Sequence, residues 1–120
     1  MLEQCYIYEG TETLEIVQKV MKEAKYIPSH NEMVSHSFSY GDRLVTTIVV
    51  ELLLWRTSST SSLTITMVSD KTHIDCYVVS SGAGTSLSNI SWGSYKKILK
   101  EADKLLTGLG FNIIEKVARP

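Results

Sequence analysis

Glycine and small hydroxyl residues are concentrated in the stretch Ser80–Ser94, SSGAGTSLSNISWGS, between an apolar run ending near Val79 and an amphipathic stretch beginning near Trp92. Backbone amides at such a strand-to-helix junction can bind an anion. The stretch lacks both the Lys-Ser/Thr of a P-loop and the tight glycine spacing of a dinucleotide fingerprint. A structural turn and a ligand site therefore remain alternative interpretations. The ligand-site residues would be Ser81, Gly82, Gly84, Thr85, Ser86 and Ser94.

Two further patterns could support hydrolytic chemistry. Ser94 and Lys97 form an S-x-x-K at a predicted helix start, where a lysine can activate a serine, but the companion motifs do not follow in the required order. His73 and Asp75 alternate on one predicted strand and so project from the same face, as an acid–base pair would. The alternative for this pair is a solvated polar patch.

Other polar residues of the predicted strands add little to these patterns. Our predicted register puts Glu51, Thr64 and Tyr77 in a cross-strand row next to the His73 pair. His36 has no second ligand nearby, which favours a hydrogen-bonded histidine over a metal ligand. No constellation in the sequence is specific enough to identify a substrate or a reaction.

Composition indicates a single globular domain, 1–120, because the chain has 120 residues, 43% hydrophobic and 21% charged. The net charge of −1 and pI near 6.3 provide no basic field, so we expect no binding to nucleic acid. The apolar run Leu44–Trp55 contains Glu51 and is about a dozen residues long, against the roughly twenty of a membrane-spanning helix. We therefore expect no membrane association.

Cysteine usage and the N-terminus bear on location. Cys5 and Cys76 are too few for a disulfide framework, and no second cysteine or histidine lies near either one to suggest a zinc site. We therefore expect reduced thiols, no metal and no cofactor. The N-terminus, MLEQCYIYEG, lacks the basic and apolar regions of a signal peptide, so we expect a cytoplasmic protein.

Hydrophobic periodicity predicts the helices and strands that position these residues. The run Gln4–Glu9 predicts an edge or first strand, and Thr11 can cap a helix from about Glu12 to Lys25. The expected buried face of this helix comprises Leu14, Val17, Val20, Met21 and Ala24. Alternation from Met33 to Val79 predicts four strands in hairpins, with turns at Tyr40-Gly41-Asp42, Thr57-Ser58-Ser59 and Asp70-Lys71.

A final amphipathic helix begins near Trp92 and ends at Gly108 or Gly110. Its apolar stripe comprises Tyr95, Ile98, Leu99, Ala102, Leu105 and Leu106. The tail after Phe111 could add a strand or follow the surface, and the sequence does not decide between the two. The predicted fold is a two-layer α+β domain of order β-α-β-β-β-β-α, with an antiparallel sheet of about five strands and two helices on one face.

Alternation also assigns the faces of the strands. Leu63, Ile65 and Met67 should face the helices. Tight turns would set them opposite Val78, Cys76 and Ile74 on the next strand. Leu63 and Ile65 should also lie opposite Leu52 and Val50. We extend this core face to Val34, His36 and Phe38, beside Leu44, Thr46 and Ile48.

The opposite face is too apolar for a fully solvated surface. Such a patch indicates a partner, a ligand or an incompletely covered sheet. We favour a homodimer that uses this face, because one self-complementary patch serves both subunits. The expected interface residues are Val45, Val49, Glu51, Leu53, Trp55 and Tyr77.

Three features of the C-terminal half stand out together: the Ser62–Thr66 strand, Ser80-Ser81-Gly82 with a further glycine, and Asn89-Ile90-Ser91-Trp92-Gly93. In these features the C-terminal half resembles a small bacterial family, domain of unknown function 6054. An acidic residue expected soon after Gly93 is replaced by Ser94, Tyr95 and Lys96. The resemblance implies a bacterial, cytoplasmic, small α+β protein and adds no reaction.

Three functions are consistent with these observations. The leading expectation is a non-enzymatic binding or interaction domain that self-associates through the open sheet face. The second is a small-ligand or anion-binding protein that uses the Gly-rich 80–94 junction. The third is a small hydrolase-like enzyme that uses Ser94 with Lys97, or His73 with Asp75.

Overall fold

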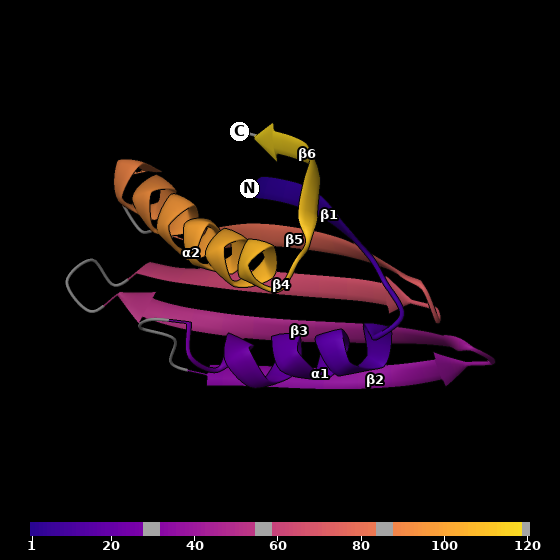
Figure 1. The fold of residues 1–120 in the computed structure, drawn as a ribbon. Helices are drawn as coiled ribbons and strands as arrows, with labels where there is room; N and C mark the ends of the chain where they lie inside the picture. The colour runs from indigo at the N-terminus through magenta and orange to yellow at the C-terminus, as the bar shows by residue number, and fades with distance from the viewer. Residues whose placement is uncertain (28–31, 55–58, 84–87, 119–120) are drawn as a thin grey trace.

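The chain folds into one six-stranded antiparallel sheet with two helices, an α+β fold (Figure 1). The computed structural model describes residues 1–27, 32–54, 59–83 and 88–118. The elements are β1 (Leu2–Glu9), α1 (Thr13–Ala24), β2 (Glu32–Tyr40), β3 (Arg43–Leu54), β4 (Ser59–Ser69), β5 (His73–Ala83), α2 (Ser88–Gly108) and β6 (Asn112–Ala118). The predicted class is confirmed, and six strands replace the expected five because the tail after Phe111 forms β6.

The strands lie in the order β2-β3-β4-β5-β1-β6. The four hairpin strands β2–β5 follow one another both in the chain and in the sheet, as the alternating pattern predicts. β1 pairs with β5 on one side and with β6 on the other, so it is the first strand of the chain but an interior strand of the sheet. The edges of the sheet are therefore β2 and β6.

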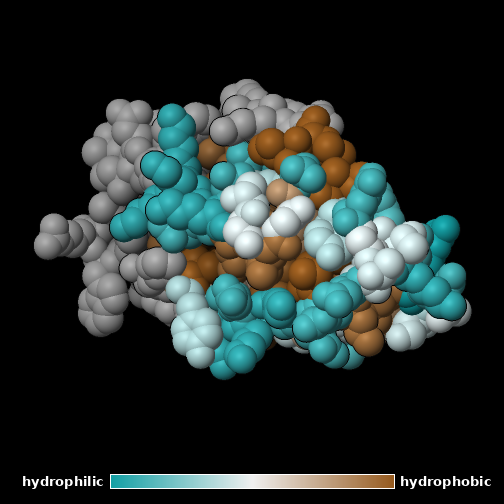
Figure 2. All heavy atoms as spheres, viewed as in Figure 1, coloured by the Kyte–Doolittle hydropathy of each residue, from teal (hydrophilic) through white to brown (hydrophobic). Residues whose placement is uncertain are grey.

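Both helices cover the same face of the sheet, with α2 against β4 and β5 and α1 against β3 and β4 (Figure 1). Side chains from this face and from the helices form a single buried core. The predicted core side chains of β4 and β5 are all buried, which confirms their face assignment: Leu63, Ile65, Met67, Ile74, Cys76 and Val78. Figure 2 shows hydrophobic residues between the helices and over β6, where Ile113 and Ile114 are exposed.

The register of these strands differs from the predicted one by two residues. Met67 lies opposite Cys76 and Ile65 opposite Val78, because the chain turns at Lys71-Thr72, one residue later than predicted: the amide of Asp70 donates to the carbonyl of His73, and Ser69 pairs with Ile74. Likewise Leu63 lies opposite Val50, and not opposite Leu52. A shift of two preserves the face of every side chain, so the core prediction holds although the pairing was wrong.

α1 begins one residue later than predicted and turns a different residue outward. Its buried residues are Thr13, Ile16, Val17, Val20 and Ala24. Leu14, predicted to be buried, is exposed. The cap position is Glu12, and no side chain caps it. Instead the Thr13 hydroxyl donates a hydrogen bond to the carbonyl oxygen of Asp70, which ties the helix start to the β4–β5 connection.

α2 carries the predicted apolar stripe and the predicted stop. Ile98, Leu99, Ala102 and Leu106 are buried, and Leu105 is partly buried against the core. The side chain of Tyr95 lies outside the described ones. Gly110 has a φ of +99°, and the amide of Phe111 donates to the carbonyl of Leu106. Gly110 therefore ends the helix in a left-handed conformation that glycine adopts readily.

A buried polar group also joins the two layers. The hydroxyl of Tyr6 on β1 lies within hydrogen-bond distance of Oε1 of Gln4 and of Oδ1 of Asp103 on α2. One hydroxyl proton serves only one of these oxygens, and turning the Gln4 amide would let its N–H donate to Tyr6. Burial, then the hydrogen bond to Asp103 and the charge of its carboxylate, raise the pKa of Tyr6. The phenol is therefore neutral in the folded protein.

Candidate functional site: the uncovered face of the sheet

The face of the sheet opposite the helices, here called the uncovered face, holds most of the candidate residues. Both described helices pack on the other side. Pairing across the sheet gives one row of Phe38, Val45, Val68, Asp75 and Ile7. A second row comprises Val34, Val49, Thr64, Val79 and Glu3. The row between them comprises His36, Thr47, Thr66, Tyr77 and Cys5. Two largely apolar rows thus flank a polar one.

β2 departs most clearly from the sequence prediction. Val34, His36 and Phe38 were expected to face the helices, and this is wrong. Val34 pairs with Val49 and Phe38 with Val45, so these side chains lie on the uncovered face, and Ser35 and Ser37 alternate toward the helix side. The reason is the two-residue turn at Gly41, whose φ of +63° suits glycine. This turn makes Tyr40 the partner of Arg43 and sets the face of every earlier residue of β2.

The most exposed large hydrophobic residues of the uncovered face are on β2. Val34 is 59% exposed, Phe38 55% and Tyr40 65%. Sequence reasoning missed these three as surface residues. The signal that could have found them is the length of the turn, because a two-residue hairpin fixes the pairing of its strands.

The predicted interface residues that the structure describes lie on this face. Val45 and Val49 are half-buried, and Glu51 and Tyr77 are exposed. Leu53 belongs to β3, opposite Thr60, but its side chain is not described. Trp55, the predicted aromatic anchor, lies outside the described residues.

Charge is unevenly distributed along the β2–β3 hairpin. Glu32 and Glu51 are direct cross-strand partners at one end, an arrangement of like charges that destabilises a sheet slightly. Arg43 lies at the other end, where its charge helps to lower the pKa of Asp70. Among the described residues, no ion pair includes Glu32, Glu51 or Arg43. The face therefore has an acidic end and an end that carries a cation.

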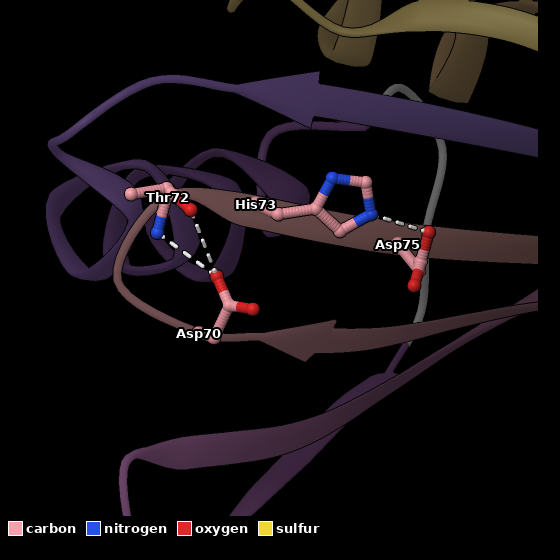
Figure 3. Close-up of polar contacts among 4 residues, drawn as sticks. All are labelled: Asp70, Thr72, His73 and Asp75. Carbon is pink, nitrogen blue, oxygen red and sulfur yellow. Dashed lines mark hydrogen bonds and ion pairs between the residues drawn. The ribbon is translucent and has the colours of Figure 1, made fainter.

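His73 and Asp75 do come together as predicted, on the same face of β5 (Figure 3). The Nε2 of His73 lies 2.7 Å from Oδ1 of Asp75. Across the sheet, Asp75 is flanked by Val68 and Ile7, which offer no nucleophile. The geometry is that of an exposed polar pair beside a hydrophobic row.

The predicted polar row beside this pair does not form. Glu51 pairs with Ser62, Thr64 with Val79, and Tyr77 with Thr66, so these three residues occupy three different rows. The two-residue shift in register separates Glu51, Thr64 and Tyr77 into these rows. The prediction of a polar row beside the His73 pair is therefore wrong, and the acid–base hypothesis itself stays a prediction.

The connection before His73 is stabilised locally. The carboxylate of Asp70 accepts hydrogen bonds from the amide of Thr72, at 2.9 Å, and from its hydroxyl (Figure 3). The amide hydrogen bond is the main reason that the pKa of Asp70 is lowered. These contacts stabilise a turn at Lys71-Thr72 in place of the predicted turn at Asp70-Lys71.

The Gly-rich junction is only partly described. Ser81 and Gly82 belong to β5, which continues to Ala83, and the hydroxyls of Ser62 and Ser81 are hydrogen-bonded at 2.9 Å. α2 begins at Ser88, earlier than the predicted Trp92. Gly84, Thr85 and Ser86 lie outside the described residues, as does the side chain of Ser94. The ligand-site interpretation and the Ser94–Lys97 hypothesis therefore stay predictions.

Metal-ligating groups and surface hollows are the remaining features that bear on ligand binding. The part of the chain that the structure describes contains no group of three or more His, Cys, Asp or Glu residues arranged to hold a metal ion. A surface hollow of about 480 Å³ lies at the start of α1, lined by Thr11–Glu15, Gln18 and Lys71. All of these side chains except Thr13 are exposed, and the hydroxyl of Thr13 already donates a hydrogen bond to the carbonyl of Asp70.

A family model described as a family of unknown function, DUF6054, matches residues 7–110. The chain belongs to this family. The match runs from β1 through α2, so the family resemblance extends well beyond the C-terminal half. No curated protein matches the chain. None of the helices in the described ranges is long and apolar enough to cross a membrane.

Proposed function

We propose that this member of DUF6054 is a non-enzymatic interaction domain that self-associates through the uncovered face of its sheet. The observation that carries the proposal is the orientation of β2. This strand directs Val34, Phe38 and Tyr40 away from the helix layer and directs its serines toward it. A strand normally turns its apolar side toward a buried surface, so β2 is patterned for burial of the uncovered face.

The composition of the face supports sheet-on-sheet packing. Its two apolar rows consist mainly of valines, and Thr47 and Thr66 are direct partners in the row between them. β-branched side chains give the flat, regular surface that packs well against a second sheet. Contiguous exposed apolar surface of this kind is uncommon on monomeric proteins.

The charges support a second copy as the partner. A twofold axis across the strands reverses their direction, so that the Glu32–Glu51 end of one subunit meets the Arg43 end of the other. The same rotation exchanges the two apolar rows and keeps the polar row at the centre. One patch thus complements itself in both hydrophobicity and charge.

Replacing Val49 with Lys tests the proposal, because a lysine at the centre of the contact would be buried without a partner. Leu14→Lys is the matched control, since Leu14 is equally apolar but lies on α1, outside the uncovered face. We expect sedimentation velocity to show a larger assembly for the wild type and for Leu14→Lys than for Val49→Lys, because only Val49→Lys disrupts the contact through the uncovered face. A wild-type chain that stays monomeric at high concentration would overturn the proposal.

We also propose a cytoplasmic location. Neither Cys5 nor Cys76 forms a disulfide, and the two side chains lie on opposite faces of the sheet, where they cannot join to each other. A reducing compartment suits a half-buried thiol such as Cys5. Fractionation of the native host should recover the protein with cytoplasmic markers, and recovery from an extracytoplasmic fraction would contradict this location.

A further inference from the structure

β2 presents a second surface, distinct from the uncovered face, along its free edge. It is an edge strand of nine residues that, among the described strands, pairs with β3 alone. Tyr40 and Arg43 flank a two-residue turn and therefore form a hydrogen-bonded pair. Because such pairs alternate along a hairpin, Met33, Ser35, Ser37 and Ser39 turn their N–H and C=O groups away from β3. These groups form a row that another strand could pair with.

The two edges of the sheet differ in how they are protected. β6 is interrupted by a register shift opposite Cys5 and Tyr6, and it carries Glu115 and Lys116. Bulges and charges of this kind discourage pairing with another strand. β2 pairs without interruption over its whole length, contains no proline or lysine, and has one acidic residue, Glu32, at its start. The β2 edge is thus the unprotected one.

The sequence of β2 is nearly symmetric about His36. Reading outward from His36 in EMVSHSFSY, Ser35 matches Ser37, and Val34 matches Phe38. An antiparallel second β2 centred on His36 would therefore place serine beside serine on one face and valine beside phenylalanine on the other. It would also make Ser35 and Ser37 partners, and these residues carry outward-facing backbone groups. All nine residues pair in this register.

The charges select the antiparallel direction. The antiparallel direction places Glu32 beside Tyr40 of the second copy. Within that copy Tyr40 pairs with Arg43, and the charge of Arg43 also acts on Asp70. A parallel arrangement would instead bring the two Glu32–Glu51 ends together, where like charges repel. Charge and side-chain pairing therefore agree on one arrangement.

We infer that two copies of this chain join edge to edge through β2, antiparallel and centred on His36, to form one continuous twelve-stranded sheet. The twofold axis lies perpendicular to the sheet, so the contact closes after two copies and does not propagate. This edge contact does not depend on packing of the uncovered face. A substitution can therefore disrupt either contact and leave the other in place.

Cysteine cross-linking tests this symmetric contact directly. In a Cys5→Ser background, His36→Cys places a thiol on the twofold axis, where it meets its own copy at cross-strand distance. We expect mild oxidation with diamide to convert most of this variant to a covalent dimer. Thr47→Cys in the same background is the matched control, because Thr47 is the partner of His36 on β3, one strand from the edge. It should remain largely monomeric on a denaturing gel.

A proline substitution then identifies the edge as the cause. Ser35→Pro in the His36→Cys variant removes one outward N–H and leaves the hydrogen bonds to β3 in place, so cross-linking should fall at least severalfold. Ser35→Ala keeps the N–H and should not change the yield. Circular dichroism establishes that both variants are folded.

The results separate this inference from the proposed function. Failure of His36→Cys to cross-link, or cross-linking that Ser35→Pro leaves unchanged, would overturn the edge contact. Equal cross-linking of Thr47→Cys and His36→Cys would also overturn it, because Thr47 lies one strand from the edge. The Val49→Lys experiment reports on the uncovered face and does not bear on this edge.

Discussion

The hydroxyl of Tyr6 lies 2.6 Å from Oδ1 of Asp103, although the two residues are 97 positions apart in the chain. Tyr6 is in the interior strand β1, and Asp103 is in the helix that covers β4 and β5. Both Tyr6 and its second neighbour, Gln4, are buried. This polar contact therefore fixes α2 over the sheet at one point of the buried layer.

We expect Tyr6→Phe to lower the free energy of unfolding by about 1–3 kcal/mol, because Gln4 and Asp103 lose their partner in a site of restricted solvent access. Urea denaturation measures this loss. Tyr40→Phe is the matched control, since Tyr40 is exposed, and it should change stability by less than about 0.5 kcal/mol. Equal effects of the two substitutions would show that the contact with Asp103 contributes nothing to stability.

The sequence was sufficient to predict the core of β4 and β5. Leu63, Ile65 and Met67 alternate with small polar residues, so only one face can be buried, and an error of two in the register leaves that face unchanged. The turn at Lys71-Thr72, where the carboxylate of Asp70 binds Thr72, could not be distinguished from a turn at Asp70-Lys71 by residue type alone.

β2 was not predictable by the same reasoning, because we assumed that apolar side chains face the helices. Val34 and Phe38 face the other way, and only the length of the turn at Gly41 contains that information. Leu14 was misassigned for a related reason. A buried helix face that includes Leu14 and one that includes Ile16 share Val17, Val20 and Ala24. In the structure, the face that includes Ile16 packs against the sheet.

The candidate site was predictable as a face more readily than as a set of neighbours. Val45, Val49, Glu51 and Tyr77 lie on the uncovered face as expected, because alternation alone places them there. Cross-strand neighbours depend on register, which is why Glu51 and Thr64 do not lie in the row predicted beside His73.

The face assignment of β4 can be tested with one pair of substitutions. Ile65 is fully buried, so Ile65→Ala should cost roughly 2–4 kcal/mol through lost transfer energy and a residual cavity. Its neighbour Thr66 lies on the uncovered face, and Thr66→Ala should cost much less in urea denaturation of the dilute protein. A loss below about 0.5 kcal/mol for Ile65→Ala would mean that β4 faces the other way.

The two cysteines should differ in reactivity because they occupy opposite faces of adjacent strands. Cys76 is buried in the core, and Cys5 is half-buried on the uncovered face. Burial, with a smaller contribution from nearby Cys5, raises the pKa of Cys76 to about 12. In dilute folded protein, iodoacetamide should therefore modify Cys5 first. Equally fast modification of both thiols, read by mass spectrometry, would contradict the burial of Cys76.

The same thiol should make stability depend on pH in the alkaline range. The pKa of Cys76 is raised from 9.0 to about 12, so the folded protein keeps a proton that the unfolded chain releases. Its contribution is complete below the unfolded pKa and is lost as the pH rises toward the folded pKa. Between about pH 8 and about pH 10, the wild type should lose roughly 1 kcal/mol more unfolding free energy than Cys76→Ala.

Urea denaturation of both proteins at the two pH values measures the difference, and other titrating groups such as Tyr6 cancel in the comparison. Parallel losses in the two proteins would show that Cys76 ionises as readily in the folded protein as in the unfolded chain.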